Sequence, residues 1–388
     1  MRFFLHETLE RFHIREIPFT VGEAIGIMDS LTKASPLPVP TLPADAYTRP
    51  EIFAEERARI FTREWSLFTW SERLADPGRY VAATLAGYPL LVLRDGEGGL
   101  RGFHNVCRHR AAMLVREGEG QISGALVCPY HTWAYGLDGR LRKATGFGPG
   151  AEAIDRCALN LFPVAVAEWR GLIFVRIAPD GPSLTEWLGR IVPMAAHYPL
   201  EQQHYFMRKE QEIAVDWKVY GENYLECYHC RSMHPGLCAA LDIDRYTIEV
   251  HDDERFFHLY GPKRDGGMTE GLYFYKFPFL MLNLYEWGSS IATVEPLGPG
   301  RMRHINWYFF TDISAARAEA NRQSAEWSAQ IVAEDIDMVV GVQRNLNTGI
   351  YRQGLLSPER EEAVAAFQGM VRDALAGSPV AAALGAAS

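Results

Sequence analysis

The residues that point most clearly to chemistry are two cysteines and two histidines in two short segments. They are Cys107 and His109, spaced Cys-x-His, and Cys128 and His131, spaced Cys-x-x-His. Two thiolates and two imidazoles can bind zinc or a two-iron cluster. Zinc fingers usually take both cysteines from one loop, whereas here each segment supplies one of each. This order favours a [2Fe–2S] cluster in which the cysteines bind one iron and the histidines bind the other. Zinc and ordinary buried side chains are the alternatives.

A second group of candidate ligands follows about a hundred residues further along the chain. His229 and His234 are five residues apart, and Pro235 marks the end of the helix that would carry them. Residues i and i+5 do not share a helical face, so His234 must reach a common ion from the helix end. Two imidazoles and one carboxylate on one face of Fe(II) leave positions for O₂ and substrate. The pattern predicts such an iron site, with its carboxylate elsewhere in the chain.

A predicted helix over Ala315–Arg344 holds three acids that could complete this site, Glu334, Asp335 and Asp337. Only Asp335 has apolar residues at i−4, i−3, i+3, i+4 and i+7, which places it on the apolar stripe of the helix. Those neighbours are Ile331, Val332, Met338, Val339 and Val342. A buried carboxylate without a partner is costly, and a metal ion would compensate for that cost. Asp335 is therefore the predicted third ligand, and the other two acids are predicted to be solvated.

Composition and charge narrow the class of protein. The chain has 388 residues, a net charge of −9 and no strongly basic stretch, so nucleic acid is not an expected partner. The sequence contains no run of about eighteen apolar residues, so no membrane span is predicted. The first residues lack the apolar core of a secretory signal. Six cysteines are too few for a disulfide scaffold. These features predict a cytoplasmic protein whose thiolates stay reduced.

The pattern along the chain predicts an α+β fold. Residues 1–44 are an expected N-terminal extension and proline-rich linker. Residues 45–175 form a leading helix and an all-β domain of short strands, because short apolar runs alternate there with glycine-rich turns. Residues 176–388 form a helix-flanked antiparallel sheet that carries the mononuclear iron. Its predicted strands are Leu272–Asn283, Ile291–Val294 and Ile305–Phe310.

The two cysteine–histidine segments, in the context Cys107-Arg108-His109-Arg110 and Cys128-Pro129-Tyr130-His131-Thr132-Trp133, resemble the Rieske iron–sulfur motif. The interval between them is longer than is common, which indicates a loop insertion around Gly118–Gly124. The resemblance extends from about Leu42 to Phe367, to the large (α) subunits of Rieske-type non-haem iron oxygenases. It agrees with Asp335 as the distal ligand, within Glu-Asp-x₇-Gln.

The resemblance implies an oxygenase that uses O₂ and electrons from NAD(P)H, delivered by a separate flavin/iron–sulfur reductase to the Rieske cluster and then to Fe(II). No nicotinamide-binding fingerprint is present on this chain. The family forms head-to-tail rings, so a homotrimer is expected. Glu226, three residues before His229, is then expected to bridge His229 to a cluster histidine, His131, of the adjacent subunit. Glu226 and Asn223 are assigned to the catalytic site.

Substrate identity is less constrained by the sequence. The segment Glu222–Cys230 resembles choline, glycine-betaine and carnitine oxygenases, which favours N-demethylation or oxidation of a quaternary or tertiary methylated amine. Aromatic residues could cage an ammonium group or form a slot for an aromatic acid. They include Tyr273, Tyr275, Tyr285, Trp287, Trp307 and Tyr308. Ring hydroxylation or O-demethylation of an aromatic acid is the alternative, and a non-catalytic Rieske electron carrier is a distant one. In this subset Cys227, Cys230 and Cys238 are not ligands, and Cys157 is expected in the core.

Overall fold

The computed structural model describes residues 37–148, 150, 155–264 and 271–384. Val39–Ser388 form one compact unit, to which the following description applies. Residues 1–36 of the expected extension and linker lie outside the described residues. The proline-rich segment, described from Leu37 on, does not behave as a free linker. Strand β1 (Val39–Pro40) pairs with β19 (Leu355–Leu356), and the side chain of Leu42 is fully buried.

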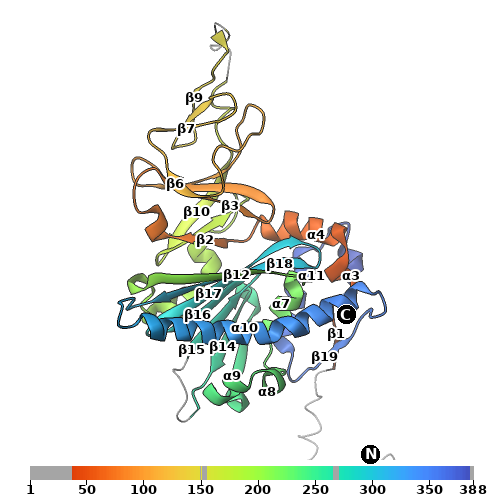
Figure 1. The fold of residues 1–388 in the computed structure, drawn as a ribbon. Coiled ribbons are helices and arrows are strands. Elements are labelled where there is room, and N and C mark those ends of the chain that lie inside the picture. Colours follow the sequence, from red (N-terminus) through yellow and green to blue (C-terminus); the bar gives the residue numbers. More distant parts are fainter. Residues whose placement is uncertain (1–36, 149, 151–154, 265–270, 385–388) are drawn as a thin grey trace, which may run out of the picture. The chain divides into compact units, whose positions relative to one another are not determined.

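The first half of this unit is built on a seven-stranded antiparallel sheet, in the order β2-β11-β10-β5-β4-β3-β6 (Figure 1). Its strands are β2 (Ser66–Trp70), β3 (Arg79–Leu85), β4 (Tyr88–Arg94), β5 (Leu100–His104), β6 (Gly118–Gln121), β10 (Pro163–Trp169) and β11 (Leu172–Arg176). In β4, Leu90 and Val92 enter one hydrophobic core, whereas Leu91 and Leu93 enter another. All four are fully buried, because the two faces of this strand each cover a core.

A smaller antiparallel sheet of three strands follows, made of β7 (Ala125–Val127), β8 (Ala134–Gly136) and β9 (Leu141–Lys143). The all-β character predicted for this part is thus present. The expected loop insertion at Gly118–Gly124 is partly wrong, because Gly118–Gln121 form β6 and pair with Arg79–Ala82 of β3. The sequence pattern did not predict this strand because its residues are polar and glycine-rich. An exposed edge strand needs no alternation of apolar and polar residues.

The second half contains another seven-stranded antiparallel sheet, in the order β12-β18-β17-β16-β15-β14-β13. Its strands are β12 (His204–Ile213), β13 (Thr247–His251), β14 (Phe256–Gly261), β15 (Gly271–Lys276), β16 (Leu280–Tyr285), β17 (Gly288–Gly298) and β18 (Arg301–Phe310). The predicted single strand Leu272–Asn283 is instead the hairpin β15–β16, with its turn at Phe277–Phe279. Pro278 in the middle of the run was the signal for this turn.

Helices cover both faces of the second sheet. Phe257 and Tyr275 point into the core formed with α7 (Trp217–Tyr224) and α11 (Glu362–Ala374). Phe256 and Phe274 point into the core that includes α5 (Leu184–Leu188) and α6 (Ile191–Met194). The helix α10 (Ala318–Asn347) runs across the sheet strands in Figure 1. The predicted helix-flanked antiparallel sheet is therefore confirmed. In the described part of the chain no helix is long and apolar enough to span a membrane.

Candidate active site

The four cysteine–histidine residues lie on two loops with the same backbone pattern. The amide of Cys107 donates to Ala112 O at 2.8 Å, and the amide of Cys128 donates to Trp133 O at 2.8 Å. Ala111 and Thr132, each four residues after its cysteine, have φ of 58° and 56°. The second loop joins the paired strands β7 and β8, so it is the tip of a hairpin. The first joins β5 to β6, which are not neighbours in the sheet, so this loop is not a hairpin tip.

The side chains of these loops have the features of a ligand set. Cys107 and Cys128 are 2% and 1% exposed. The rings of His109 and His131 lie 4.7 Å apart, and Nδ1 of each is buried without a hydrogen-bond partner. Buried polar nitrogens normally have partners, so two such orphans beside two buried thiols fit a bound cluster. Neighbouring rings hold the loops in place.

Two aromatic residues provide this support. Trp133 stacks on the ring of His109 with centroids 4.9 Å apart and an interplanar angle of 10°. The Tyr135 hydroxyl lies 3.3 Å from Cys107 Sγ and accepts from the Arg108 amide at 3.0 Å. These contacts limit rotation of the first loop and place a hydrogen-bonding group against a sulfur, a position that tunes reduction potential in iron–sulfur sites.

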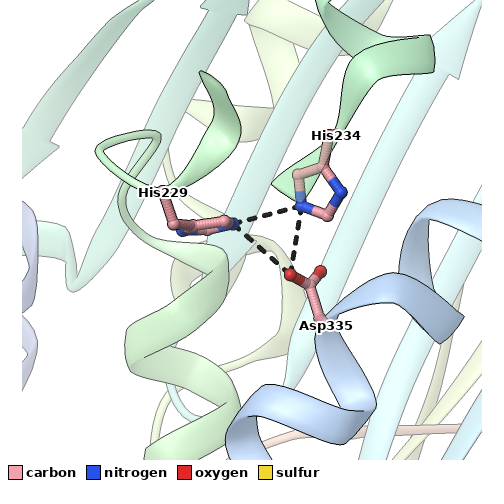
Figure 2. Close-up of side chains that lie close together, drawn as sticks. All are labelled: His229, His234 and Asp335. Carbon is pink, nitrogen blue, oxygen red and sulfur yellow. Dashed lines mark hydrogen bonds and ion pairs between the residues drawn. The ribbon is translucent and has the colours of Figure 1, made fainter. Parts of the chain in front are cut away.

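The second group of predicted ligands converges on one point (Figure 2). His229 Nε2 lies 3.2 Å from His234 Nε2 and 3.4 Å from Asp335 Oδ1. His234 Nε2 lies 3.0 Å from the same carboxylate oxygen. Ligand atoms about 2.1 Å from an ion and at right angles to one another lie about 3.0 Å apart. The three side chains therefore have the spacing of one face of an octahedral metal site.

Three elements bring these ligands together. His229 immediately precedes the short helix α8 (Cys230–Met233), His234 immediately precedes α9 (Pro235–Ala240), and Asp335 lies in α10. Asn223, near the end of α7, donates from Nδ2 to Asp335 Oδ1 at 3.4 Å. The predicted placement of His234 at a helix end is thus observed. Residues about a hundred positions apart meet because α7 and α10 pack against each other.

A buried ionic cluster fixes the start of α7. Lys218 is 0% exposed, and its Nζ lies 2.5 Å from Glu56 Oε1 and 2.7 Å from Asp216 Oδ1. Trp217 Nε1 donates to the other oxygen of Glu56 at 3.0 Å. Asp216 also caps the helix by accepting from the Lys218 amide. A lysine is buried only when it is paired, so this cluster ties α7 to the preceding helix α4 (Pro50–Glu56).

Carboxylates hold the outer nitrogens of both imidazoles. His229 Nδ1 donates to Glu226 Oε1, which leaves Nε2 directed at Asp335. His234 Nδ1 donates to Glu334 Oε2 at 2.8 Å. The prediction that Glu334 is simply solvated is therefore wrong. Because Glu334 and Asp335 are adjacent on one helix, they contact the two nitrogens of the same imidazole. Such carboxylate–imidazole pairs orient metal ligands.

The charges at the triad stabilise one another. Burial lowers the pKa of His229, but hydrogen bonds to Asp335 and Glu226 outweigh this effect and raise the pKa to about 9. Burial also opposes ionisation of Asp335, but its two histidine partners hold the pKa of the carboxyl below its usual value. Protons shared by two imidazoles and one carboxylate occupy a position suited to a divalent cation.

Only part of the apolar stripe predicted around Asp335 faces the interior of the protein. Ile331 and Val332 line the cavity beside the triad, and Val339 is buried. Met338 and Val342, however, are 53% and 42% exposed. Three of the five apolar neighbours of Asp335 therefore face inward, and the other two lie on the surface of α10.

A cavity of about 150 Å³ opens beside the triad. Aromatic side chains form much of its wall, namely Tyr220, Tyr224, Tyr246, Tyr273, Tyr285 and Trp327. A smaller cavity of about 40 Å³ shares Tyr273 and Tyr285 and is also lined by Trp287 and Tyr308. Of the aromatic residues singled out in the sequence, these four line one or both of these two cavities. Tyr275 and Trp307 lie in hydrophobic cores instead.

His304 lines the main cavity, and the sequence analysis did not single it out. It lies on β18, is 4% exposed, and its Nε2 has no hydrogen-bond partner. Burial lowers the pKa of His304 to about 4, so the ring is neutral near pH 7. Nothing in its local sequence distinguishes it from the neighbouring strand residues.

The cysteines near the triad depart from expectation. Cys227 and Cys230 form a disulfide, with Cα atoms 4.9 Å apart, whereas free thiols were predicted. Their Cys-x-x-Cys spacing was the signal. Both line the main cavity and flank His229. Cys238 is a free, partly buried thiol, and Cys157, expected in the core, is exposed.

Comparisons with known proteins agree with this arrangement. A family model for the Rieske [2Fe-2S] domain matches residues 64–163, and one for the ring hydroxylating alpha subunit (catalytic domain) matches residues 200–271 and 259–377. Choline monooxygenase of Spinacia oleracea is 31% identical over 325 residues, which cover 81% of this chain and 73% of that protein. The carnitine monooxygenase oxygenase subunit of Escherichia coli (strain K12) is 27% identical, with 82% and 87% covered.

A solved structure of a quaternary ammonium Rieske monooxygenase, studied for carnitine oxidation and inter-subunit electron transfer, has a TM-score of 0.77 and 26% identity. The match covers 87% of this chain and 96% of that one. A naphthalene 1,2-dioxygenase at 17% identity shares the fold, with a TM-score of 0.70.

Proposed function

Because the chain belongs to the Rieske-type non-haem iron oxygenases, as a large (α) subunit, we propose that it N-demethylates or otherwise oxidises a small quaternary or tertiary methylated amine. Cys107 and Cys128 would hold one iron of the [2Fe–2S] cluster, and His109 and His131 the other. When bound, the cluster supplies single electrons and the Fe(II) supplies reductive activation of O₂.

The residues around the proposed Fe(II) position either bind the ion or orient the side chains that bind it. His229, His234 and Asp335 would bind the ion on one face. Glu226 and Glu334 keep the two imidazoles in the tautomer that directs Nε2 inward, because each accepts the proton on Nδ1. Asn223 adds a weak donor to Asp335. The side of the triad toward the cavity is left to substrate and O₂.

The chemistry of the cavity wall is the observation that carries the substrate proposal. Among the described residues that line the two cavities none is lysine or arginine, whereas Glu226 and Asp335 contribute carboxylates. An aromatic acid would bring a carboxylate into this wall without a lysine or arginine to pair with it. Tyrosine and tryptophan faces attract an ammonium group instead.

The experiment is an O₂-uptake and formaldehyde assay with a surrogate reductase. Choline, glycine betaine, carnitine and a tertiary amine are compared with benzoate-type acids. Turnover of an ammonium substrate and none of the acids is expected. O₂ uptake coupled to an aromatic acid, with no turnover of any amine, would contradict the substrate proposal.

Substitution of Tyr285 tests the aromatic wall itself. Tyr285→Leu removes a ring face, which is worth about 0.5–2 kcal/mol for a cation. The KM for the ammonium substrate should therefore rise roughly 2- to 30-fold. Tyr285→Phe keeps the face and is the matched control, with little change expected. Equal KM values for the two variants would mean that the ring contributes no cation binding.

Electron supply and assembly complete the proposal. A separate flavin/iron–sulfur reductase would deliver electrons from NAD(P)H to the cluster. This step would take place in the cytoplasm, where NAD(P)⁺ is reduced again to NAD(P)H. Electrons would pass from the cluster of one subunit to the Fe(II) of its neighbour in a head-to-tail trimer. Exposed apolar side chains suited to such contacts occur at both sites, at Met113 and Tyr130 in the cluster loops and at Tyr228 and Met338 near the triad.

A further inference from the structure

A second cluster of potential ligands lies at the edge of the second sheet, on strands that carry none of the residues assigned above. Glu249 and His251 are on the edge strand β13, and His258 is on its neighbour β14. None of the three lines the substrate cavities. We propose that these three side chains bind a divalent metal ion, with Zn²⁺ as the best-suited ion.

The strand register brings the three residues together. Glu249 is paired directly with His258 across the two strands, and His251 is paired with Phe256. Because side chains alternate along a strand, Glu249, His251 and His258 all point to the same face of the sheet. The sequence spacing, Glu-x-His followed by a histidine seven residues later, does not suggest this arrangement until the hairpin is formed.

The distances fit one small ion. Glu249 Oε2 lies 3.5 Å from His251 Nε2 and 3.5 Å from His258 Nδ1. One ligand atom from each residue lies within 4.8 Å of the others. Ligand atoms at the Zn–N distance of about 2.0–2.1 Å in a tetrahedron lie about 3.3–3.4 Å apart. The observed separations are longer than hydrogen bonds and close to this edge length.

Burial distinguishes this cluster from an ordinary surface ion pair. The side chain of His251 is 8% exposed, and its Nε2, the atom directed at Glu249, is buried without a hydrogen-bond partner. Its ring stacks on Phe256, with centroids 4.2 Å apart and an interplanar angle of 14°. Packing therefore fixes the direction of this nitrogen. An ion would satisfy it, whereas a buried imidazole without a partner is unfavourable.

Two imidazoles and one carboxylate are a common zinc ligand set, in which water takes the fourth position. Glu249 is 65% exposed, so solvent reaches the carboxylate side of the cluster. The ion would join β13 to β14 at the edge of the sheet. Tyr246, immediately before β13, lines the substrate cavity. A metal ion at this position would therefore stabilise β13, the strand that directly follows the cavity residue Tyr246.

The test is zinc analysis of untagged holoenzyme by mass spectrometry after dialysis with Zn²⁺ and gel filtration. One zinc per chain is expected in the wild type and in His229→Ala, which removes the iron site. His251→Ala and His258→Ala should lose it, and Zn²⁺ should raise the Tm of the wild type but not of these variants. Glu249→Gln, at an exposed position, covers the case in which a histidine variant does not fold, and should also lose tight binding.

The matched control is His204→Ala. His204 lies on β12 at the opposite edge of the sheet and contacts a single carboxylate, Glu72, at 3.1 Å. This variant should keep the zinc. Absence of zinc from the wild type, zinc that disappears only in His229→Ala, or zinc retained in both His258→Ala and Glu249→Gln would each overturn the proposal. None of these results bears on oxygenase activity.

Discussion

The three acids of α10 allow a direct test of the iron site. Asp335→Asn keeps the shape of the side chain but removes the charge of a proposed ligand whose Oδ1 lies 3.0 Å and 3.4 Å from the two imidazoles. Fe(II) should be lost from the site. Glu334→Gln removes only the carboxylate that accepts from His234 Nδ1 at 2.8 Å. Loss of such an outer partner weakens metal binding about 10- to 100-fold, or about 1.4–2.8 kcal/mol.

Asp337→Asn is the matched control, because this residue is exposed on the same helix and no contact ties it to the triad. The assay is Fe(II) titration of protein whose mononuclear iron has been removed while the cluster is kept, with cluster absorption as the internal standard. The expected order of Fe(II) affinity is Asp337→Asn, equal to wild type, then Glu334→Gln, then Asp335→Asn. Wild-type affinity in Asp335→Asn, or identical affinities for Glu334→Gln and Asp337→Asn, would refute the reasoning.

Cys107→Ser or Cys128→Ser should abolish the visible absorption of the cluster and reduce iron from three atoms per chain to one; a normal Rieske EPR signal in either variant would end the cluster assignment. Glu226→Gln should keep both metals and the oligomer but sharply slow re-oxidation of the reduced cluster in rapid-mixing experiments with substrate and O₂, and a wild-type rate would remove Glu226 from the electron path. Lys218→Met leaves Glu56 and Asp216 buried without a cation, so the free energy of unfolding in urea should fall by about 3–5 kcal/mol. A loss below about 1 kcal/mol would show that these carboxyls protonate at little cost.

Local spacing in the sequence was sufficient to single out most of the proposed metal ligands. The Cys-x-His and Cys-x-x-His segments each form one loop, so their ligands are neighbours in space as well as in sequence. His229 and His234 are separated by one short helix, which limits the distance between them. Short apolar runs bounded by turn residues also predicted the two antiparallel sheets, because each run is long enough for one strand.

Tertiary structure decided the contacts that join distant segments. The pairing of Glu334 with His234 depends on how α10 lies against the loop after α7, and the periodicity of α10 alone assigned Glu334 to solvent. The hairpin at Pro278 brings Tyr273 and Tyr285 to the same cavity, whereas packing against Phe367 of α11 places Tyr275 in the core. The meeting of Glu249 with His258 depends on the register of β13 on β14. Such contacts arise from packing and strand register between segments, which no local pattern specifies.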